Sequence, residues 1–168
     1  FNHLGWYYHR CADERKAEIL LTRALALREK NLGSSHPEVA TSMRRLARVY
    51  LDKGEFEKVE PLLKIALEIK KKALGTEHGE VGTIMNDLGT IYFMQGRYVE
   101  AELLHKHALA IAKKSYGPEH HNVASVLTDL GMVYYFRGEF AEAAALAKRS
   151  LAMNELPIPP EHQFLAMS

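Results

Sequence analysis

The sequence predicts an all-α fold, a solenoid of stacked antiparallel helix pairs. Three observations lead to this prediction. The chain of 168 residues repeats itself every 42 residues, and because 168/42 = 4 it is four periods long. Each period contains two stretches whose apolar residues recur at the spacing of an α-helix. No stretch shows the alternating apolar and polar pattern or the Asn-Gly turn of a β-hairpin.

The repeat is visible as columns of identical residues when the chain is shifted by one period. The complete columns contain leucine, tyrosine or histidine: Leu4, Leu46, Leu88 and Leu130; Tyr8, Tyr50, Tyr92 and Tyr134; Leu20, Leu62, Leu104 and Leu146; Leu25, Leu67, Leu109 and Leu151; and His36, His78, His120 and His162. Five such columns at one spacing are not expected by chance, and a fixed period of this length is typical of repeat architectures.

The second period illustrates both helices. Residues 38–53 carry an apolar stripe, which consists of Val39, Met43, Leu46, Ala47 and Tyr50. Pro37 suits the first turn of this helix, where its missing N–H has no partner to lose. Gly54 ends the helix, a second apolar stripe runs through residues 57–74, and Gly75 ends that helix in turn. Each period is therefore expected to fold as a helical hairpin.

The register divides the chain into one array of units. Residues 1–33 form the first repeat, whose first helix is truncated and occupies about 1–10, and 160–168 begin a fifth repeat. The complete repeats between them are 34–75, 76–117 and 118–159. Solenoids need polar caps at their ends, and neither end of this sequence has one. We therefore expect the array to continue in a longer protein.

Composition excludes several classes of protein. The chain has 22 Lys+Arg against 21 Asp+Glu, a formal net charge of +1, which gives no electrostatic reason to expect nucleic acid or a membrane as a partner. Cys11 is the single cysteine, so an internal disulfide is impossible. No apolar run approaches the roughly 18 residues that cross a bilayer. These features favour a cytoplasmic protein.

The signature of a known family can be read in the third period. Its residues here are Leu88, Gly89, Tyr92, Ala101 and Ala108. They resemble the Leu-Gly-x-x-Tyr and small-residue positions of the tetratricopeptide repeat, whose usual unit has about 34 residues. The longer period and the stretches 86–102 and 108–120 resemble the kinesin light chain type, which is also widespread in bacterial repeat proteins. This resemblance covers essentially the whole chain and implies a right-handed superhelix whose concave groove binds peptides.

The motifs of common enzyme sites are missing from the sequence, including the phosphate-binding loop, the His-Glu-x-x-His zinc motif and the Gly-x-Ser-x-Gly turn. Cys11 is interpreted as an ordinary thiol. The histidine column should be spread along the solenoid, so we expect it to pack or hydrogen-bond where repeats meet; the pair His120 and His121 is the remaining metal candidate. We therefore expect a protein that is not an enzyme and needs neither cofactor nor metal.

The face of each first helix opposite the apolar stripe is the candidate binding site, because the resemblance places this face in the groove. Its residues are Asn2, Trp6 and Arg10; Thr41, Arg44 and Arg48; Thr83, Asn86, Thr90 and Phe93; and Thr128, Met132 and Tyr135. Arg44 and Arg48 lie one turn apart, a spacing suited to holding a carboxylate. Asn86 can pair with a peptide backbone, and the aromatic residues are typical interface anchors.

The leading hypothesis is a protein-interaction module that binds an extended peptide segment, acidic with an aromatic or apolar anchor. Alternatively, the candidate residues pack on neighbouring repeats or are solvated. A second hypothesis is a structural spacer that self-associates by end-to-end stacking of repeats, although a monomer is expected. A third is the regulatory arm of a larger NTPase-type or signalling protein.

Overall fold

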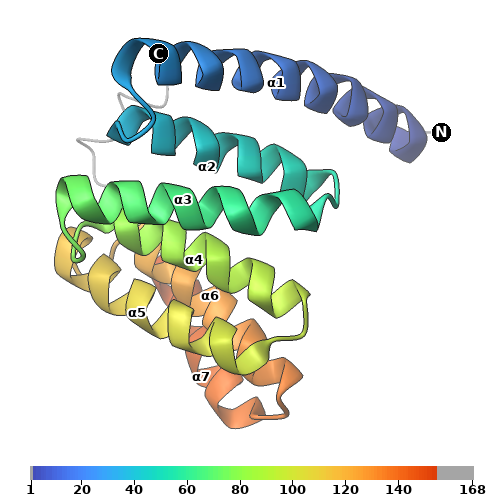
Figure 1. Ribbon diagram of the computed structural model, residues 1–168. Coiled ribbons are helices and arrows are strands. Elements are labelled where there is room, and N and C mark those ends of the chain that lie inside the picture. Colours follow the sequence, from blue (N-terminus) through green and yellow to red (C-terminus); the bar gives the residue numbers. More distant parts are fainter. Residues whose placement is uncertain (1, 155–168) are drawn as a thin grey trace, which may run out of the picture.

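The computed structural model describes the backbone of residues 2–154 and the side chains of residues 17–154. This part of the chain is helical, with no strand; its helices are α1 (Asn2–Leu32), α2 (Pro37–Asp52), α3 (Phe56–Leu74), α4 (Gly79–Met94), α5 (Tyr98–Tyr116), α6 (His121–Phe136) and α7 (Phe140–Asn154). Figure 1 shows consecutive helices running back and forth, with each pair stacked on the next. The predicted all-α solenoid is confirmed. The expected start of a fifth repeat at 160–168 lies outside the described residues.

Helix α1 departs from the expected pattern because it runs without a break from Asn2 to Leu32. We expected a truncated first helix over about 1–10, followed by a turn. In the later repeats this turn contains a glycine with positive φ: Gly54 (+74°), Gly96 (+76°) and Gly138 (+83°). Position 12 of the same column holds Ala12, and a residue with a Cβ is strained in that conformation. The expected turn is therefore absent, and the helix continues through Ala12.

The recurrent histidine is the N-cap of the first helix in each later repeat. The Nδ1 atoms accept the backbone N–H two residues on: His36 from Glu38 at 3.2 Å, His78 from Glu80 at 3.2 Å and His120 from Asn122 at 3.1 Å. Each bond satisfies one of the amide donors that a helix start leaves without an intrahelical partner. These three histidines thus form hydrogen bonds where repeats meet, as expected, while His162 lies outside the described residues.

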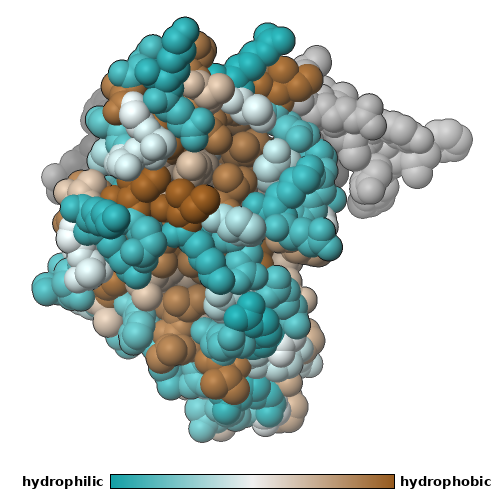
Figure 2. All heavy atoms as spheres, in the orientation of Figure 1, coloured by the Kyte–Doolittle hydropathy of each residue, from teal (hydrophilic) through white to brown (hydrophobic). Residues whose placement is uncertain are grey.

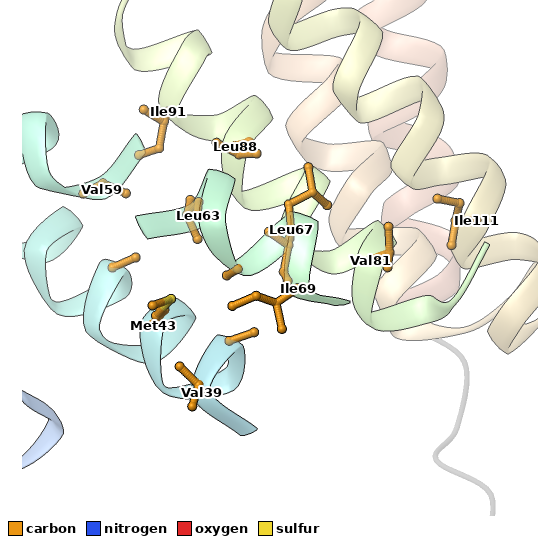
Figure 3. Packing of buried hydrophobic residues seen from close by; sticks show 14 residues of the cluster. Val39, Met43, Val59, Leu63, Leu67, Ile69, Val81, Leu88, Ile91 and Ile111 are labelled. Atoms are coloured by element: carbon orange, nitrogen blue, oxygen red, sulfur yellow. The ribbon is translucent and has the colours of Figure 1, made fainter. Parts of the chain in front are cut away.

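Apolar side chains from successive hairpins meet in a core that is continuous through α2, α3, α4 and α5. Figure 3 shows Val39 and Met43 of α2 facing Leu63, Leu67 and Ile69 of α3. The core continues through α4 to Ile111 of α5, and a second cluster lies between α5, α6 and α7. Each helix pair therefore buries its apolar face against its neighbours, as a solenoid requires.

Glycine is required at several points where α4 closely approaches α5; Gly79 faces Tyr116, Gly82 faces Ile111, and Gly89 faces His105. A Cβ added to Gly89 of α4 would lie 2.7 Å from the imidazole Cε1 of His105 on α5, so only glycine fits there without a shift. The equivalent glycine of the next repeat, Gly131, is not constrained in this way, because a Cβ there would meet Ala143 O at 3.6 Å, an ordinary contact. The approach at Gly89 is tight because the third repeat has His105 where the second has Leu63.

Polar contacts recur at the repeat boundaries together with the apolar ones. The hydroxyl of Tyr92 donates to Glu60 at 3.2 Å, and the hydroxyl of Tyr134 donates to Glu102 at 3.2 Å. Each bond joins the second helix of one repeat to the first helix of the next. The tyrosines are half-buried, so their rings pack inward while their hydroxyls reach the glutamates.

Truncating a buried leucine should destabilise the solenoid, because it leaves a cavity. The side chain of Leu67 is 8% exposed and that of Leu103 is 57% exposed. Leu67→Ala should lower the free energy of unfolding by about 2–5 kcal/mol, whereas Leu103→Ala should change it by about 0.5 kcal/mol or less. Urea unfolding followed by circular dichroism measures both. Equal stability of the two variants would contradict the assigned core.

Removing a histidine cap should also cost stability, by a different mechanism. His78→Ala leaves the backbone N–H of Glu80 without its acceptor, so the free energy of unfolding should fall by about 1 kcal/mol. His78→Asn keeps an acceptor at the N-cap and should lose less. If urea unfolding finds the alanine variant as stable as the asparagine variant, the capping role is wrong.

Candidate functional site

A groove of about 380 Å³ runs along the first helices of the three later repeats. Its polar lining comes from α2, α4 and α6 and comprises Arg44, Arg48, Thr83, Asn86, Asp87, Thr90, Asn122, Ser125 and Asp129. Apolar residues of the first and second helices, among them Ala47, Leu63 and Ala108, line the rest. Figure 2 shows apolar and hydrophilic residues interleaved across the visible face of the described chain.

The predicted site residues fall into separate groups. Five of them line the groove, namely Arg44, Arg48, Thr83, Asn86 and Thr90. Thr41 and Thr128 do not line it; the hydroxyl of Thr41 donates to Pro37 O at 3.2 Å within its own helix, and that of Thr128 lies 3.1 Å from Ala124 O and 2.7 Å from the hydroxyl of Ser150 on α7. Phe93, Met132 and Tyr135 also lie outside the groove lining. The side chains of Asn2, Trp6 and Arg10 lie outside the described residues.

Sequence reasoning missed the acidic residues Asp87 and Asp129 and the amide Asn122, which all line the groove. Asp87 and Asp129 share one column of the repeat and directly follow the candidate positions Asn86 and Thr128. The signal was therefore present as a pair of acidic residues one period apart. These two acids lie one residue beyond the stripe of each first helix that opposes the apolar face, so the spacing of that stripe does not include them.

Arg44 and Arg48 differ in their surroundings. The Nε atom of Arg44 donates to Asp87 Oδ2 at 2.5 Å, which ties α2 to α4. Arg48 is exposed, and it forms no hydrogen bond or ion pair with any residue whose side chain the structure describes. The expected pair of equivalent arginines is therefore asymmetric. Arg48 is the cation that is open to a ligand, whereas Arg44 is already paired with an acid.

Asn86 sits at the centre of a polar chain that joins three helices. Its Oδ1 lies 2.8 Å from Nδ1 of His105 on α5, and its Nδ2 donates to Asp129 Oδ2 on α6 at 2.6 Å. His105 is 1% exposed, and burial lowers the pKa of its imidazole to about 4. The ring is therefore neutral at neutral pH, and its Nδ1–H donates to Asn86 because a carbonyl oxygen only accepts. One N–H and one lone pair of Asn86 remain for a ligand.

Asp129 gives the α6 end of the groove a negative charge. The pKa of its carboxyl group is raised, mainly because the group is buried. The hydrogen bond from Asn86 and the charge of Arg48 lower this pKa, and the charge of Asp87 raises it further. On the groove wall, the opposite charges of Arg44 and Asp87 offset each other, because the two side chains form an ion pair. The groove is consequently bipolar, with the open cation Arg48 on α2 and the carboxylate of Asp129 on α6.

Aromatic side chains form a separate cluster at the turns that join α4 to α5 and α6 to α7. Its members are Phe93, Tyr98, Tyr135, Phe136 and Phe140. The rings of Phe93 and Phe136 meet edge to face with centroids 5.2 Å apart, which joins the two repeats. Phe93 and Tyr135 thus belong to this aromatic cluster, while Met132 is exposed on α6.

Stacked helical hairpins with a polar groove along their first helices define a helical-repeat protein of the solenoid class. The chain belongs to the tetratricopeptide repeat family, because the model of that family matches residues 1–72, 52–114 and 80–155. Such repeats form protein-interaction scaffolds, and folds of this kind are typically not catalytic. A search of curated proteins found no match.

Solved structures refine the type of repeat. The crystal structure of BtubC (BKLC) from P. vanneervenii is similar at 27% identity with a TM-score of 0.75, covering 94% of this chain and 64% of that chain. The Podosopora anserina putative kinesin light chain repeats are similar at 28% identity with a TM-score of 0.73, covering 95% and 76%. The kinesin light chain-like type is thereby confirmed, and the chain spans slightly less than two thirds of BtubC.

Within the described side chains, no group of three or more His, Cys, Asp or Glu residues is arranged to hold a metal ion. Among the helices of the described chain, none combines the length and the apolar character that crossing a lipid bilayer requires.

The buried imidazole of His105 should make stability depend on pH. Its folded pKa of about 4 lies below the ordinary value of 6.5, so the unfolded chain binds more protons and stability falls as the pH drops from about 6.5 towards 4. His105→Leu, which copies Leu63 of the second repeat, should lose less stability between pH 7 and pH 5 than the wild type, by about 1–2 kcal/mol. Urea unfolding at both pH values measures the difference; equal losses would rule out a neutral buried His105.

Proposed function

We propose that the groove binds an extended peptide segment of a partner protein and places an acidic side chain of that segment at Arg48. The observation that carries the proposal is the exposed guanidinium of Arg48, which lines the groove without an ion-pair partner among the described side chains. A guanidinium binds a carboxylate through two parallel hydrogen bonds. Arg44 contributes positive charge nearby but must share it with Asp87.

Contacts with the peptide backbone are the second part of the proposal. The amide of Asn86 keeps one N–H and one lone pair, which match the C=O and N–H of a peptide group. The hydroxyls of Thr83 and Thr90 donate to Gly79 O at 3.0 Å and Asn86 O at 3.1 Å, so their oxygens remain acceptors on the groove wall. An extended segment exposes the backbone groups that such a wall can pair with.

The aromatic cluster supplies the apolar anchor of the proposal. Leu51 lines the groove at the position that Phe93 and Tyr135 occupy in the next two repeats. From this register we expect the cluster to lie beside the end of the groove at which the first helices finish. An aromatic or apolar side chain of the bound segment would bury exposed ring surface there, and buried rings dominate interface energies.

End-to-end stacking of repeats is a second candidate function, and one observation favours it. Phe93 of the third repeat is covered by Phe136 of the fourth, whereas Tyr135, which occupies the same column, is 57% exposed. Another repeat placed on α7 would cover Tyr135 in the same way. Light scattering over a range of concentrations separates the candidates, since stacking produces growing assemblies. A regulatory arm and a cytoplasmic location stay predictions.

Reversing the charge of Arg48 should remove the acidic contact. The test uses 12-residue peptides selected from a displayed random library on the wild-type protein, with affinities measured by fluorescence anisotropy. Arg48→Glu should weaken the acidic binders about tenfold or more, the loss expected for one charge-assisted contact. Helicity and Tm should stay unchanged.

Arg45→Glu is the matched control, because Arg45 is exposed on the same helix and does not line the groove. It makes the same change in net charge and should leave affinity within about threefold, since exposed charges contribute little. Equal binding by the Arg48 and Arg45 variants would refute the groove assignment.

A further inference from the structure

We infer that the segment bound in the groove also carries a cationic side chain, a lysine or an arginine, which pairs with Asp129 and fixes the direction of the segment along the groove. This inference rests on the proposed function and deepens it. It is drawn from the order of charges on α2, α4 and α6 and from the partners that each charge already has.

Two hydrogen bonds of the groove are equivalent in the repeat but differ in charge. Arg44 donates to Asp87, and one period later Asn86 donates to Asp129; both pairs are 43 residues apart in the sequence. The donor of the first pair is a cation, which neutralises Asp87. The donor of the second pair is a neutral amide, so the charge of Asp129 stays uncompensated by its hydrogen-bond partner.

The other charged groups near Asp129 do not complete an ion pair. Asp87 on α4 repels it, and Arg48 on α2 attracts it from beyond the 4 Å that defines an ion pair. Asp129 is half-buried. A carboxylate withdrawn from water without a cation is costly, and a cation that arrives with a ligand offsets that cost.

A structural role alone does not account for an aspartate at this position. The hydrogen bond from Asn86 needs only an acceptor oxygen, which a neutral asparagine would provide at the same place. The repeat interface therefore does not require the negative charge of Asp129. On the wall of a groove, this charge favours a ligand that carries a positively charged group.

The two ends of the groove together specify a direction. An acidic side chain at Arg48 lies against the second repeat, and a basic side chain at Asp129 lies against the fourth. The same segment bound in the reverse direction would bring its base to Arg48 and its acid to Asp129. Like charges facing each other reject that orientation, which is how charged interfaces select one arrangement.

The experiment uses capped, fluorescently labelled peptides built on alanine, each with one tryptophan, one glutamate and one lysine. The glutamate and lysine are separated by about two to six residues, a range that an extended chain spans at roughly 3.3 Å per residue, and both orders are made. Matched peptides replace lysine or glutamate by glutamine. Fluorescence anisotropy measures binding to the wild type and to Asp129→Asn, with Asp52→Asn as the control, because Asp52 is an acid of α2 that does not line the groove.

On the wild type, replacing the lysine by glutamine in the order that binds more tightly should weaken binding about tenfold. Asp129→Asn should abolish this difference and leave the glutamate-only peptide within about threefold of its wild-type affinity. Asp52→Asn should leave the difference unchanged. Asp129→Lys combined with a peptide whose lysine is replaced by glutamate should restore tight binding.

Three results overturn the inference. These are an equal affinity of the lysine and glutamine peptides for the wild type, a preference for lysine over glutamine that survives in Asp129→Asn, and an equal loss of every peptide in that variant, which would mean that Asp129 acts only through Asn86. Failure of the proposed function looks different. In that case no peptide binds the wild type, or Arg48→Glu leaves every affinity unchanged, whereas binding that needs Arg48 but ignores the lysine rejects only the present inference.

Discussion

The register of the second, third and fourth repeats depends on a hydrogen bond at each of the two boundaries between them, from a tyrosine on a first helix to a glutamate on the preceding second helix. Tyr92 reaches Glu60 and Tyr134 reaches Glu102, each at 3.2 Å. Apolar burial drives the helices together but is not directional, so it does not by itself choose how far one hairpin slides along the next. The hydrogen bond is directional, and the guanidinium of Arg97, 3.7 Å from the ring centroid of Tyr92, packs over the same contact.

The candidate site is a product of that stacking and not a separate feature of the chain. The bonds from Arg44 to Asp87 and from Asn86 to Asp129 each join neighbouring first helices, so they exist only when the repeats are in register. The absence of a side chain at Gly89 lets His105 approach α4, and His105 in turn orients the amide of Asn86. Packing in the core thus determines which polar groups the groove presents.

Periodicity predicted the helices, their order and their apolar faces, because those properties depend on residues a few positions apart. Periodicity wrongly predicted that the first helix ends near residue 10. The turn needs a glycine with positive φ, and the first repeat has Ala12 at that position. Periodicity found Arg44, Arg48 and Asn86 but not their partners, since a contact between repeats depends on the offset of the stacked helices and not on local spacing. Phe93 and Tyr135 share the stripe of Asn86, yet they lie near the ends of their helices, where they join the aromatic cluster.

The offset between donor and acceptor has a consequence for specificity. Each of the two bonds between neighbouring first helices joins a residue to the position one period and one residue further on, so the donor of one repeat determines the charge balance of the next. Arginine at position 44 neutralises the acid of the third repeat, and asparagine at position 86 leaves the acid of the fourth repeat charged. A substitution in one repeat therefore alters the recognition chemistry of its neighbour while the core stays the same. The specificity of the groove is for this reason a property of pairs of repeats, and it cannot be obtained by adding up the exposed residues of each repeat separately.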